Sequence, residues 1–184
     1  MLKNLFLLTT ICIAVASCKS SKKAAAAADK PIHVEVKSDA YPEKTSEKTN
    51  RKAKKGSKKT NNIINTALSY HGTPYRYGGT TKKGMDCSGL VYTSFKQNNL
   101  SLQRSSRLMA SQGRKIKLKN VEKGDLLFFT TSKNRRRINH VGLVVEVKGR
   151  DIKFIHSTTS RGVLVSSLGE GYWNHAFNHA RRIL

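Results

Sequence analysis

Gly84-Met85-Asp86-Cys87-Ser88-Gly89-Leu90 carries the strongest structural signal in this chain. The two flanking glycines suit a tight turn that leads into a helix. Apolar and small residues then recur at the spacing of one helix face, at Leu90, Val91, Ser94 and Phe95. A cysteine in the first helical turn meets the positive end of the helix dipole and unpaired backbone N–H groups, which both favour the thiolate. We therefore expect Cys87 to be reactive.

The other two cysteines lie in an N-terminal stretch that resembles an export signal. Residues 1–17 combine a basic Lys3, an apolar run from Leu5 to Val15 that is too short to span a bilayer, and a small-residue end. Val15-Ala16-Ser17-Cys18 resembles the lipobox of bacterial lipoproteins, where cleavage before the cysteine leaves it to carry the lipid. Cys18 is thus the predicted lipidation site. The alternative is an ordinary cleaved signal with an incidental cysteine.

The rest of the chain divides into a tether and one folded domain. Residues 18–60 are rich in Lys, Ala, Ser, Glu and Thr, so they have little to bury and are predicted to be a lipidated, disordered, basic tether. Residues 61–184 are predicted to be the folded domain. This domain has Cys87 as its single thiol, and cysteines outside the cytoplasm are usually paired. The alternative to a chemical role for this thiol is burial as a small apolar side chain.

The chain is strongly basic. Its formal net charge is +24, and residues 61–184 alone carry 21 Lys or Arg against 6 Asp or Glu. Such a charge favours an anionic partner, and wall polymers and acidic lipid head groups are closer to an exported protein than nucleic acid is. We therefore predict no nucleic-acid partner. The alternative is a solvated basic surface that only favours solubility.

The order of the predicted elements indicates an α+β fold with helices first and an antiparallel sheet later. One helix ends near His71-Gly72, a second follows Cys87, and a third is capped by Ser105 or Ser106 and ends before Gly113. Runs of β-branched and aromatic residues predict strands at 126–130, 141–147, 152–155, 163–165 and 177–183.

Two histidines lie at the ends of neighbouring predicted strands. His140 opens the strand 141–147 and His156 follows the strand 152–155, with a hairpin turn predicted near Gly149. A turn centred near Lys148 places the histidines opposite each other, and a turn one residue later offsets them modestly. Together with Cys87 they could supply a nucleophile, a base and an orienting group. A zinc site of these three residues is an alternative, although it lacks closely spaced ligand pairs.

These residues resemble the NlpC-type peptidoglycan endopeptidases. The resemblance rests on Asp86-Cys87-Ser88-Gly89-Leu90, on His140-Val141-Gly142 and on Phe154-Ile155-His156. Further motifs follow in the same order: Gly72-Thr73-Pro74-Tyr75-Arg76-Tyr77-Gly78-Gly79, Arg104-Ser105-Ser106 and Gly124-Asp125-Leu126-Leu127-Phe128-Phe129. The similarity covers roughly residues 63–184 and does not reach the tether.

The resemblance implies a papain-like fold with helices packed on an antiparallel sheet, and a cysteine peptidase that needs neither metal nor other cofactor. It implies Cys87 as nucleophile, His140 as general base and His156 as third polar residue, acting on stem peptides or cross-links of bacterial peptidoglycan through a thioester. Cleavage is implied next to a D-glutamyl residue or a diamino acid. Substrate-binding positions carried over from the family are Tyr75, Asp86, Ser88 and Arg104.

Two other functions remain compatible with the sequence. One is a catalytically silent tether that joins a membrane to peptidoglycan, and the other is an amidase or acyltransferase on the same fold. We expect a monomer in the cell envelope that reaches the membrane through the lipid on Cys18. Lys19 after this cysteine resembles lipoproteins sent to the outer membrane, so we expect the domain to face the periplasm.

Overall fold

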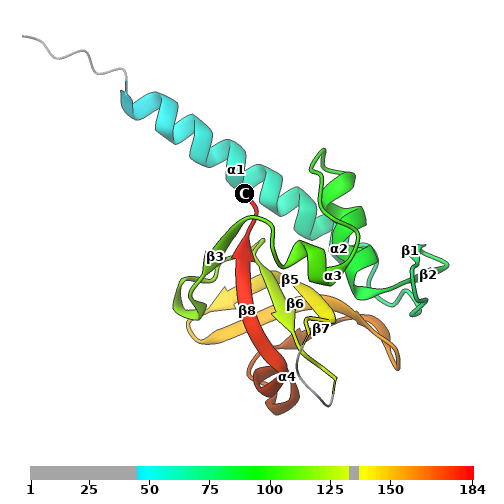
Figure 1. Cartoon of the computed structure of the whole chain (residues 1–184). Helices are drawn as coiled ribbons and strands as arrows, with labels where there is room; N and C mark the ends of the chain where they lie inside the picture. The colour runs from blue at the N-terminus through cyan, green and yellow to red at the C-terminus, as the bar shows by residue number, and fades with distance from the viewer. Residues whose placement is uncertain (1–44, 133–136) are drawn as a thin grey trace, which may run out of the picture. The chain divides into compact units, whose positions relative to one another are not determined.

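The computed structural model describes residues 45–132 and 137–184 (Figure 1). The predicted signal, Cys18 and the first part of the predicted tether lie outside these residues. Five helical segments are described: α1 (Thr45–Leu68), α2 (Cys87–Lys96), α3 (Ser106–Met109), the 3-10 turn η1 (Leu118–Asn120) and α4 (Gly171–Ala176). The helix predicted after Cys87 is confirmed, whereas η1 and α4 were not predicted.

The start of α1 corrects the predicted extent of the disordered tether. The sequence predicts disorder up to Thr60, but the backbone is helical from Thr45 onward. The C-terminal half of α1 buries Ile63, Ile64 and Ala67 against the core. A helix anchored in this way extends readily through neighbouring residues, since each added residue contributes a hydrogen bond and Lys and Ala are good helix formers.

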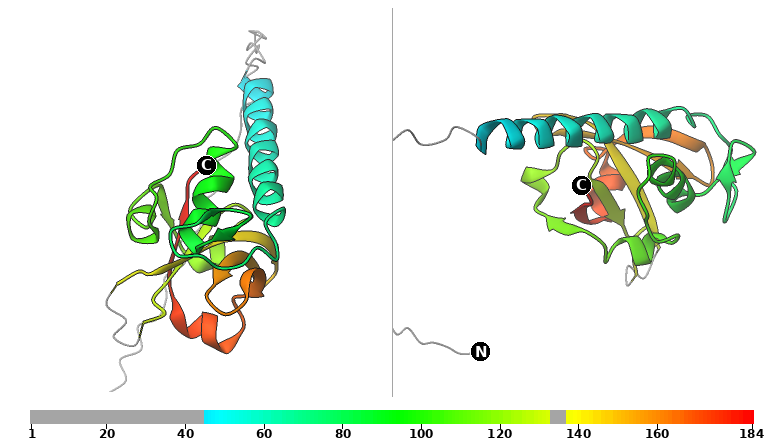
Figure 2. Two further views of the ribbon diagram at one scale, coloured as in Figure 1. Left: turned by 90° about the vertical axis from the view of Figure 1, so that its right-hand side faces the viewer. Right: turned by 90° about the horizontal axis from the view of Figure 1, so that it is seen from above.

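Six antiparallel strands form the main sheet, in the order β3-β8-β4-β5-β6-β7. They are β3 (Arg114–Ile116), β4 (Leu126–Phe129), β5 (His140–Lys148), β6 (Asp151–Thr158), β7 (Gly162–Ser167) and β8 (Phe177–Arg182). A short hairpin of β1 (Thr80–Thr81) and β2 (Gly84–Met85) precedes α2. The predicted α+β fold is confirmed, because helices precede and cover an antiparallel sheet (Figure 2).

Both faces of the sheet are buried, as β4 illustrates. Alternate side chains of a strand point to opposite faces, and all four residues of β4 are buried. Leu126 and Phe128 join the core beneath α1 and α2, whereas Leu127 and Phe129 join a second core that includes Trp173 of α4. An uninterrupted apolar strand is expected where a sheet is covered on both sides.

A β-bulge in β5 decides where the two histidines lie. The hairpin turn is Gly149-Arg150, and the register between β5 and β6 shifts by one residue at Val145. Leu143 lies opposite Ile155, so their side chains share one face of the sheet. His140 and His156, each an odd number of residues away, both point to the opposite face. Without the extra residue the two imidazoles would point to opposite faces, because a shift of one residue reverses the side chains of a strand. The prediction that the histidines are neighbours is confirmed.

Candidate active site

Cys87 begins α2, and Asp86 caps this helix. The Asp86 carboxylate accepts hydrogen bonds from the backbone N–H of Gly89 at 2.5 Å and from that of Gly78 at 2.7 Å. A Cβ atom on Gly89 would lie 2.0 Å from the carbonyl oxygen of Gly79, so this position requires glycine. The cap and the close packing together fix the position of the Cys87 backbone.

Asp86, Ser88 and Arg104, which are predicted to bind substrate, form a supporting network behind the helix start. The Arg104 guanidinium donates to both carboxylate oxygens of Asp86, at 3.1 and 3.2 Å, and to the Ser88 hydroxyl at 2.9 Å. Asp86 and Ser88 are buried, and none of the three lines the cleft beside Cys87. Their polar groups bind one another, because a buried carboxylate requires such partners.

The Cys87 thiol is buried, and this changes the protonation state expected from its helix position. Burial raises the pKa of Cys87 to about 11, and the nearby Asp86 charge also raises it. Hydrogen bonds with the backbone of Val141, Ser88 and Cys87 itself oppose this rise without cancelling it. The structure therefore holds a neutral thiol at pH 7, and loss of its proton requires a nearby base. The contact with Val141 places the sulfur at the start of β5, beside His140.

His140 and His156 form a buried hydrogen-bonded pair. His140 Nε2 lies 2.9 Å from His156 Nδ1, and the two rings are perpendicular, with 88° between their planes. His156 Nε2 lies 3.1 Å from the hydroxyl of Ser166 on β7. Ser166 was not among the predicted site residues, because the predicted strand ended at residue 165. The apolar run Val163-Leu164-Val165 gives no local signal that the strand continues through Ser166.

Two proton arrangements satisfy both contacts, because the Ser166 hydroxyl can either accept or donate a hydrogen bond. If His140 donates its Nε2 proton to His156 Nδ1, then His156 carries its proton on Nε2 and donates to Ser166 Oγ. Nδ1 of His140 then has no proton and can accept one. In the reverse arrangement Ser166 donates to His156 Nε2 and His156 Nδ1 donates to His140 Nε2, which leaves the proton of His140 on Nδ1. The first arrangement is therefore the one in which His140 Nδ1 can act as a base.

Trp173 of α4 encloses the histidine pair. Its ring stacks on His140 with 5.2 Å between the ring centres and meets His156 edge-on at 4.5 Å. In this apolar setting burial lowers the pKa of His140 to about 4 and that of His156 to about 2, the latter also through the charges of His140 and Arg161. Both imidazoles are therefore neutral at pH 7. Trp173 was not among the predicted site residues, because no helix was predicted where α4 lies.

These shifts predict a loss of stability in acid. The pKa of His140 falls from about 6.5 in an unfolded chain to about 4 in the folded protein. The contribution of neutral His140 to the free energy of unfolding is therefore complete above pH 6.5 and declines as the pH falls toward 4. Preferential protonation of His140 in the unfolded chain should lower this free energy by about 3 kcal/mol over the range. Urea unfolding at pH 7 and pH 4 measures the change. His140→Asn should reduce the difference, and an equal decline in this variant would contradict the assignment.

A pocket of about 440 Å³ brings the predicted site residues together. It is lined by Cys87 and His140, by Tyr75 from the segment before β1, by the loop 157–161 and by the start of α4. Burial and the neighbouring Cys87 raise the pKa of Tyr75, so its phenol keeps its proton. Arg161 and Glu170 are exposed on the lining and place opposite charges in the same pocket. His156 lies behind His140, fully buried.

Within residues 45–132 and 137–184, no group of three or more His, Cys, Asp or Glu side chains is placed to hold a metal ion. No helix in this part of the chain is both long enough and apolar enough to cross a membrane.

A thiol at a helix start that shares a cleft with one imidazole, itself hydrogen-bonded to a second and buried imidazole, is the arrangement of a cysteine peptidase on an α+β domain. The comparison with known families gives the particular group. Residues 72–182 match the NlpC/P60 family, and the chain belongs to it.

Characterised relatives and solved structures agree with this family. The chain is 43% identical over 116 residues to the "Probable endopeptidase NlpC" of Escherichia coli K12, covering 62% of this chain and 72% of the relative. It is 38% identical over 125 residues to the "Murein DD-endopeptidase MepS/Murein LD-carboxypeptidase" of the same strain, covering 67% of this chain and 63% of that protein. The match thus spans less than two thirds of the second relative.

Among solved structures, an NlpC/P60 family protein from Bacillus cereus superposes with a TM-score of 0.62 at 28% identity, covering 68% of this chain and 40% of that one. A Staphylococcus aureus protein described as "similar to lipoprotein, NLP/P60 family" gives a TM-score of 0.60 at 28% identity, with coverages of 69% and 42%. The similarity therefore lies in the peptidase domain, and the other parts of these longer proteins have no counterpart in the alignment.

Proposed function

We propose that this protein is a cell-wall hydrolase that cleaves stem peptides or cross-links of bacterial peptidoglycan. The observation that carries the proposal is the placement of Cys87 beside a neutral, hydrogen-bonded histidine pair in one open pocket. Relatives named as murein endopeptidase and as gamma-D-glutamyl-L-lysine dipeptidyl-peptidase support peptidoglycan as the substrate. A silent binding tether would not require a thiol, a base and an orienting group to coincide.

The proposed reaction is acyl transfer through a thioester. His140 Nδ1 takes the thiol proton as Cys87 Sγ attacks a stem-peptide carbonyl, so that the thiolate forms only as it reacts. His156 stabilises the resulting imidazolium by accepting from His140 Nε2, and Ser166 holds His156 in the required tautomer. Backbone N–H groups at the start of α2 stabilise the oxyanion, together with the neutral Tyr75 hydroxyl. His140 then protonates the leaving amine, and water releases the acyl group.

The charges in the pocket fit the chemistry of a stem peptide. Arg161 offers a guanidinium for a substrate carboxylate, such as that of a D-glutamyl residue. Glu170 receives the backbone N–H of Ser167 on one carboxylate oxygen at 2.8 Å, which leaves the other oxygen for the amine of a diamino acid. These two side chains favour a scissile bond next to a D-glutamyl residue or a diamino acid.

The direct test is a digest of purified peptidoglycan followed by mass analysis of the fragments. We expect new amino and carboxyl ends within stem peptides or cross-links. Modified peptidoglycan with intact peptide bonds would favour the amidase or acyltransferase alternative. Binding to the wall material without any new fragment would favour the tether.

We further propose that the mature protein is a monomer attached to the outer membrane through a lipid on Cys18, with its domain facing the periplasm. Support comes from the lipobox-like sequence, from Lys19 after it, and from the solved Staphylococcus aureus relative described as similar to lipoprotein. Cys18→Ser should move the protein from the membrane fraction to the soluble fraction, because a chain without acyl groups loses about 0.8 kcal/mol of binding per buried methylene. Fractionation with the active-site variant Cys87→Ser as control measures this, and unchanged membrane association would contradict it.

A further inference from the structure

One corner of the domain carries a dense positive charge that the proposed active site does not use. We call it the basic corner: β3, η1 and the turn after them, residues 114–123. Five exposed side chains supply its charge, namely Arg114, Lys115, Lys117, Lys119 and Lys123. None of the five forms an ion pair with another described residue. The acidic residue of this segment, Glu122, is already paired with Arg182 at 3.0 Å.

The basic corner also exposes an apolar side chain. Leu118 lies between Lys117 and Lys119 and is 46% exposed. Beside it is a hollow of about 430 Å³ with apolar walls, and Lys119 and Arg150 stand among its lining residues. The apolar walls are Val121, Val147, Ile152, Leu168 and Phe177. The cations of the corner complement the phosphates of an anionic lipid surface, and the exposed leucine and apolar hollow complement its acyl chains.

The strand register places the start of this corner, Arg114, away from the active site. β3 pairs with the end of β8, where Arg114 lies opposite Arg182. The start of β8 pairs with Phe129, which also pairs with His140 at the active site. Figure 1 shows α4 and the C-terminus at the two ends of β8. Asn174 and Phe177 bring the hollow close to α4, but no residue lines both the hollow and the active-site pocket. The hollow and the pocket are therefore separate surfaces.

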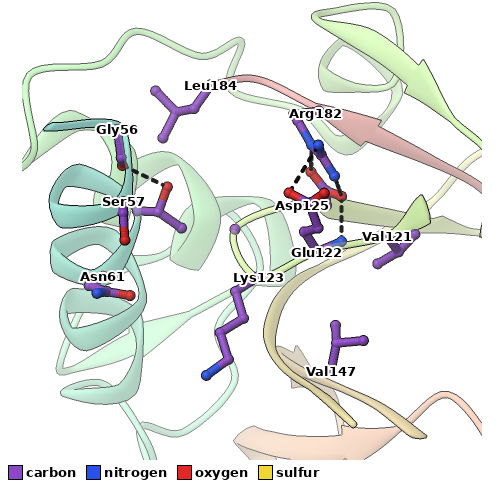
Figure 3. Close-up of a pocket in the computed structure, with 12 residues that line it drawn as sticks. Gly56, Ser57, Asn61, Val121, Glu122, Lys123, Asp125, Val147, Arg182 and Leu184 are labelled. Carbon is purple, nitrogen blue, oxygen red and sulfur yellow. Dashed lines mark hydrogen bonds and ion pairs between the residues drawn. The ribbon is translucent and has the colours of Figure 1, made fainter. Parts of the chain in front are cut away.

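A middle turn of α1, at Thr60, approaches the same end of the domain. Gly124 packs so closely on Thr60 that an added Cβ would lie 2.5 Å from the Thr60 methyl group. Figure 3 shows α1 beside the turn that carries Lys123, with the Asp125–Arg182 ion pair behind it. The chain thus enters the described domain at the end that also carries the basic corner.

Protection of a sheet edge explains only part of this pattern. β3 is an edge strand, and lysines on such strands prevent unwanted pairing between sheets. That role accounts for Arg114 and Lys115. It does not account for an exposed leucine on η1, since protection against association would favour a polar residue at that position.

We propose that the basic corner docks on an anionic phospholipid bilayer, with Leu118 entering the boundary between head groups and acyl chains. The lysines attract the lipid phosphates, and each basic side chain near such a surface raises the affinity about fivefold. The residues that dock are not residues of the active-site pocket. Docking is independent of hydrolysis, so the proposal does not rest on the proposed function.

The test places a tryptophan at position 118 of the full-length protein and adds vesicles whose lipids carry bromine on their acyl chains. Bromine quenches tryptophan that enters the acyl region, and the native tryptophan, Trp173, is 5% exposed. The emission of Leu118→Trp should fall by roughly half on vesicles that contain anionic lipid, because docking buries the ring about 5–10 Å deep. Leu108→Trp is the matched control, since Leu108 is 49% exposed but lies on α3.

Two further arms separate lipid docking from other causes. Adding Lys115→Gln, Lys117→Gln and Lys119→Gln to Leu118→Trp should abolish the quenching, whereas the same change at the exposed Lys82, Lys83 and Lys96 should not. Equal quenching of the two tryptophan variants, or none for Leu118→Trp, would overturn the proposal. The protein could instead bind soluble polyphosphate through the three corner lysines, while vesicles leave the emission of Leu118→Trp unquenched. That result would assign the corner to a soluble polyanion and overturn the lipid proposal.

Discussion

Cys87→Ala should abolish release of peptidoglycan fragments, with a loss of kcat/KM on the order of 10⁶-fold, as for removal of a catalytic nucleophile elsewhere. Alanine has no group that can form the thioester, and the general base alone cannot replace it. The digest with mass analysis described above measures the loss. Fragments released by Cys87→Ala at an undiminished rate would show that another group performs the reaction.

The fold of Cys87→Ala should remain intact, which makes the loss interpretable. Cys87 contributes one small sulfur atom to the core and is 9% exposed, so its replacement leaves a small void beside the open pocket. The urea midpoint should stay close to that of the unchanged protein. Cys87→Ser is the matched control for volume, and it should be nearly as inactive because a hydroxyl is a poorer nucleophile here.

The buried thiol adds a pH criterion to this prediction. Because burial raises the pKa of Cys87 to about 11, alkylation of the thiol by iodoacetamide should be slow at pH 7 and accelerate toward alkaline pH. This differs from the sequence-based expectation of a thiolate favoured by the helix dipole. The dipole and the backbone donors are present, but the loss of hydration at the buried sulfur outweighs them. A rate that already reaches its plateau at pH 7 would contradict the neutral thiol.

Local patterns carried most of what the sequence could predict. The turn and apolar spacing around Cys87 specify α2, and the β-branched runs specify the strands that hold both histidines. The pairing of these strands was predictable because a short hairpin links them. These features depend on residues near one another in the chain, for which spacing is informative.

The parts of the site that the sequence did not predict depend on distant contacts. The bulge at Val145 that turns His140 and His156 to one face is a property of the sheet. Trp173 reaches the pair from α4, and Ser166 from β7. Asp86 and Arg104 match family motifs, yet whether they contact substrate or each other depends on packing around Gly79 and Gly89.

Replacing each histidine separately should distinguish the general base from the group that orients it. His140→Ala removes the proton acceptor, so kcat/KM should fall by about 10³- to 10⁴-fold. His156→Ala leaves His140 in place but removes its partner, and its effect should be milder, about 10²-fold. His156→Asn should retain more activity than His156→Ala, because an amide oxygen can accept from His140 Nε2 as asparagine does in papain-like proteases.

The pH dependence of these variants distinguishes orientation from simple packing. Burial and the charges of His140 and Arg161 lower the pKa of His156 and keep it neutral. Loss of His156 also removes the edge-on contact with Trp173 and the hydrogen-bond partner of His140 Nε2. If His156 orients the base, His156→Asn should recover part of the kcat/KM lost in His156→Ala, together with the acid limb of the pH profile. His156→Leu, whose side chain has the shape of asparagine but is apolar, should recover neither. Equal kcat/KM and equal pH profiles for His156→Asn and His156→Leu would show that the pair contributes packing alone.

Ser166→Ala should shift the profile in the same direction as His156→Ala and by less, since it acts on His140 only through His156.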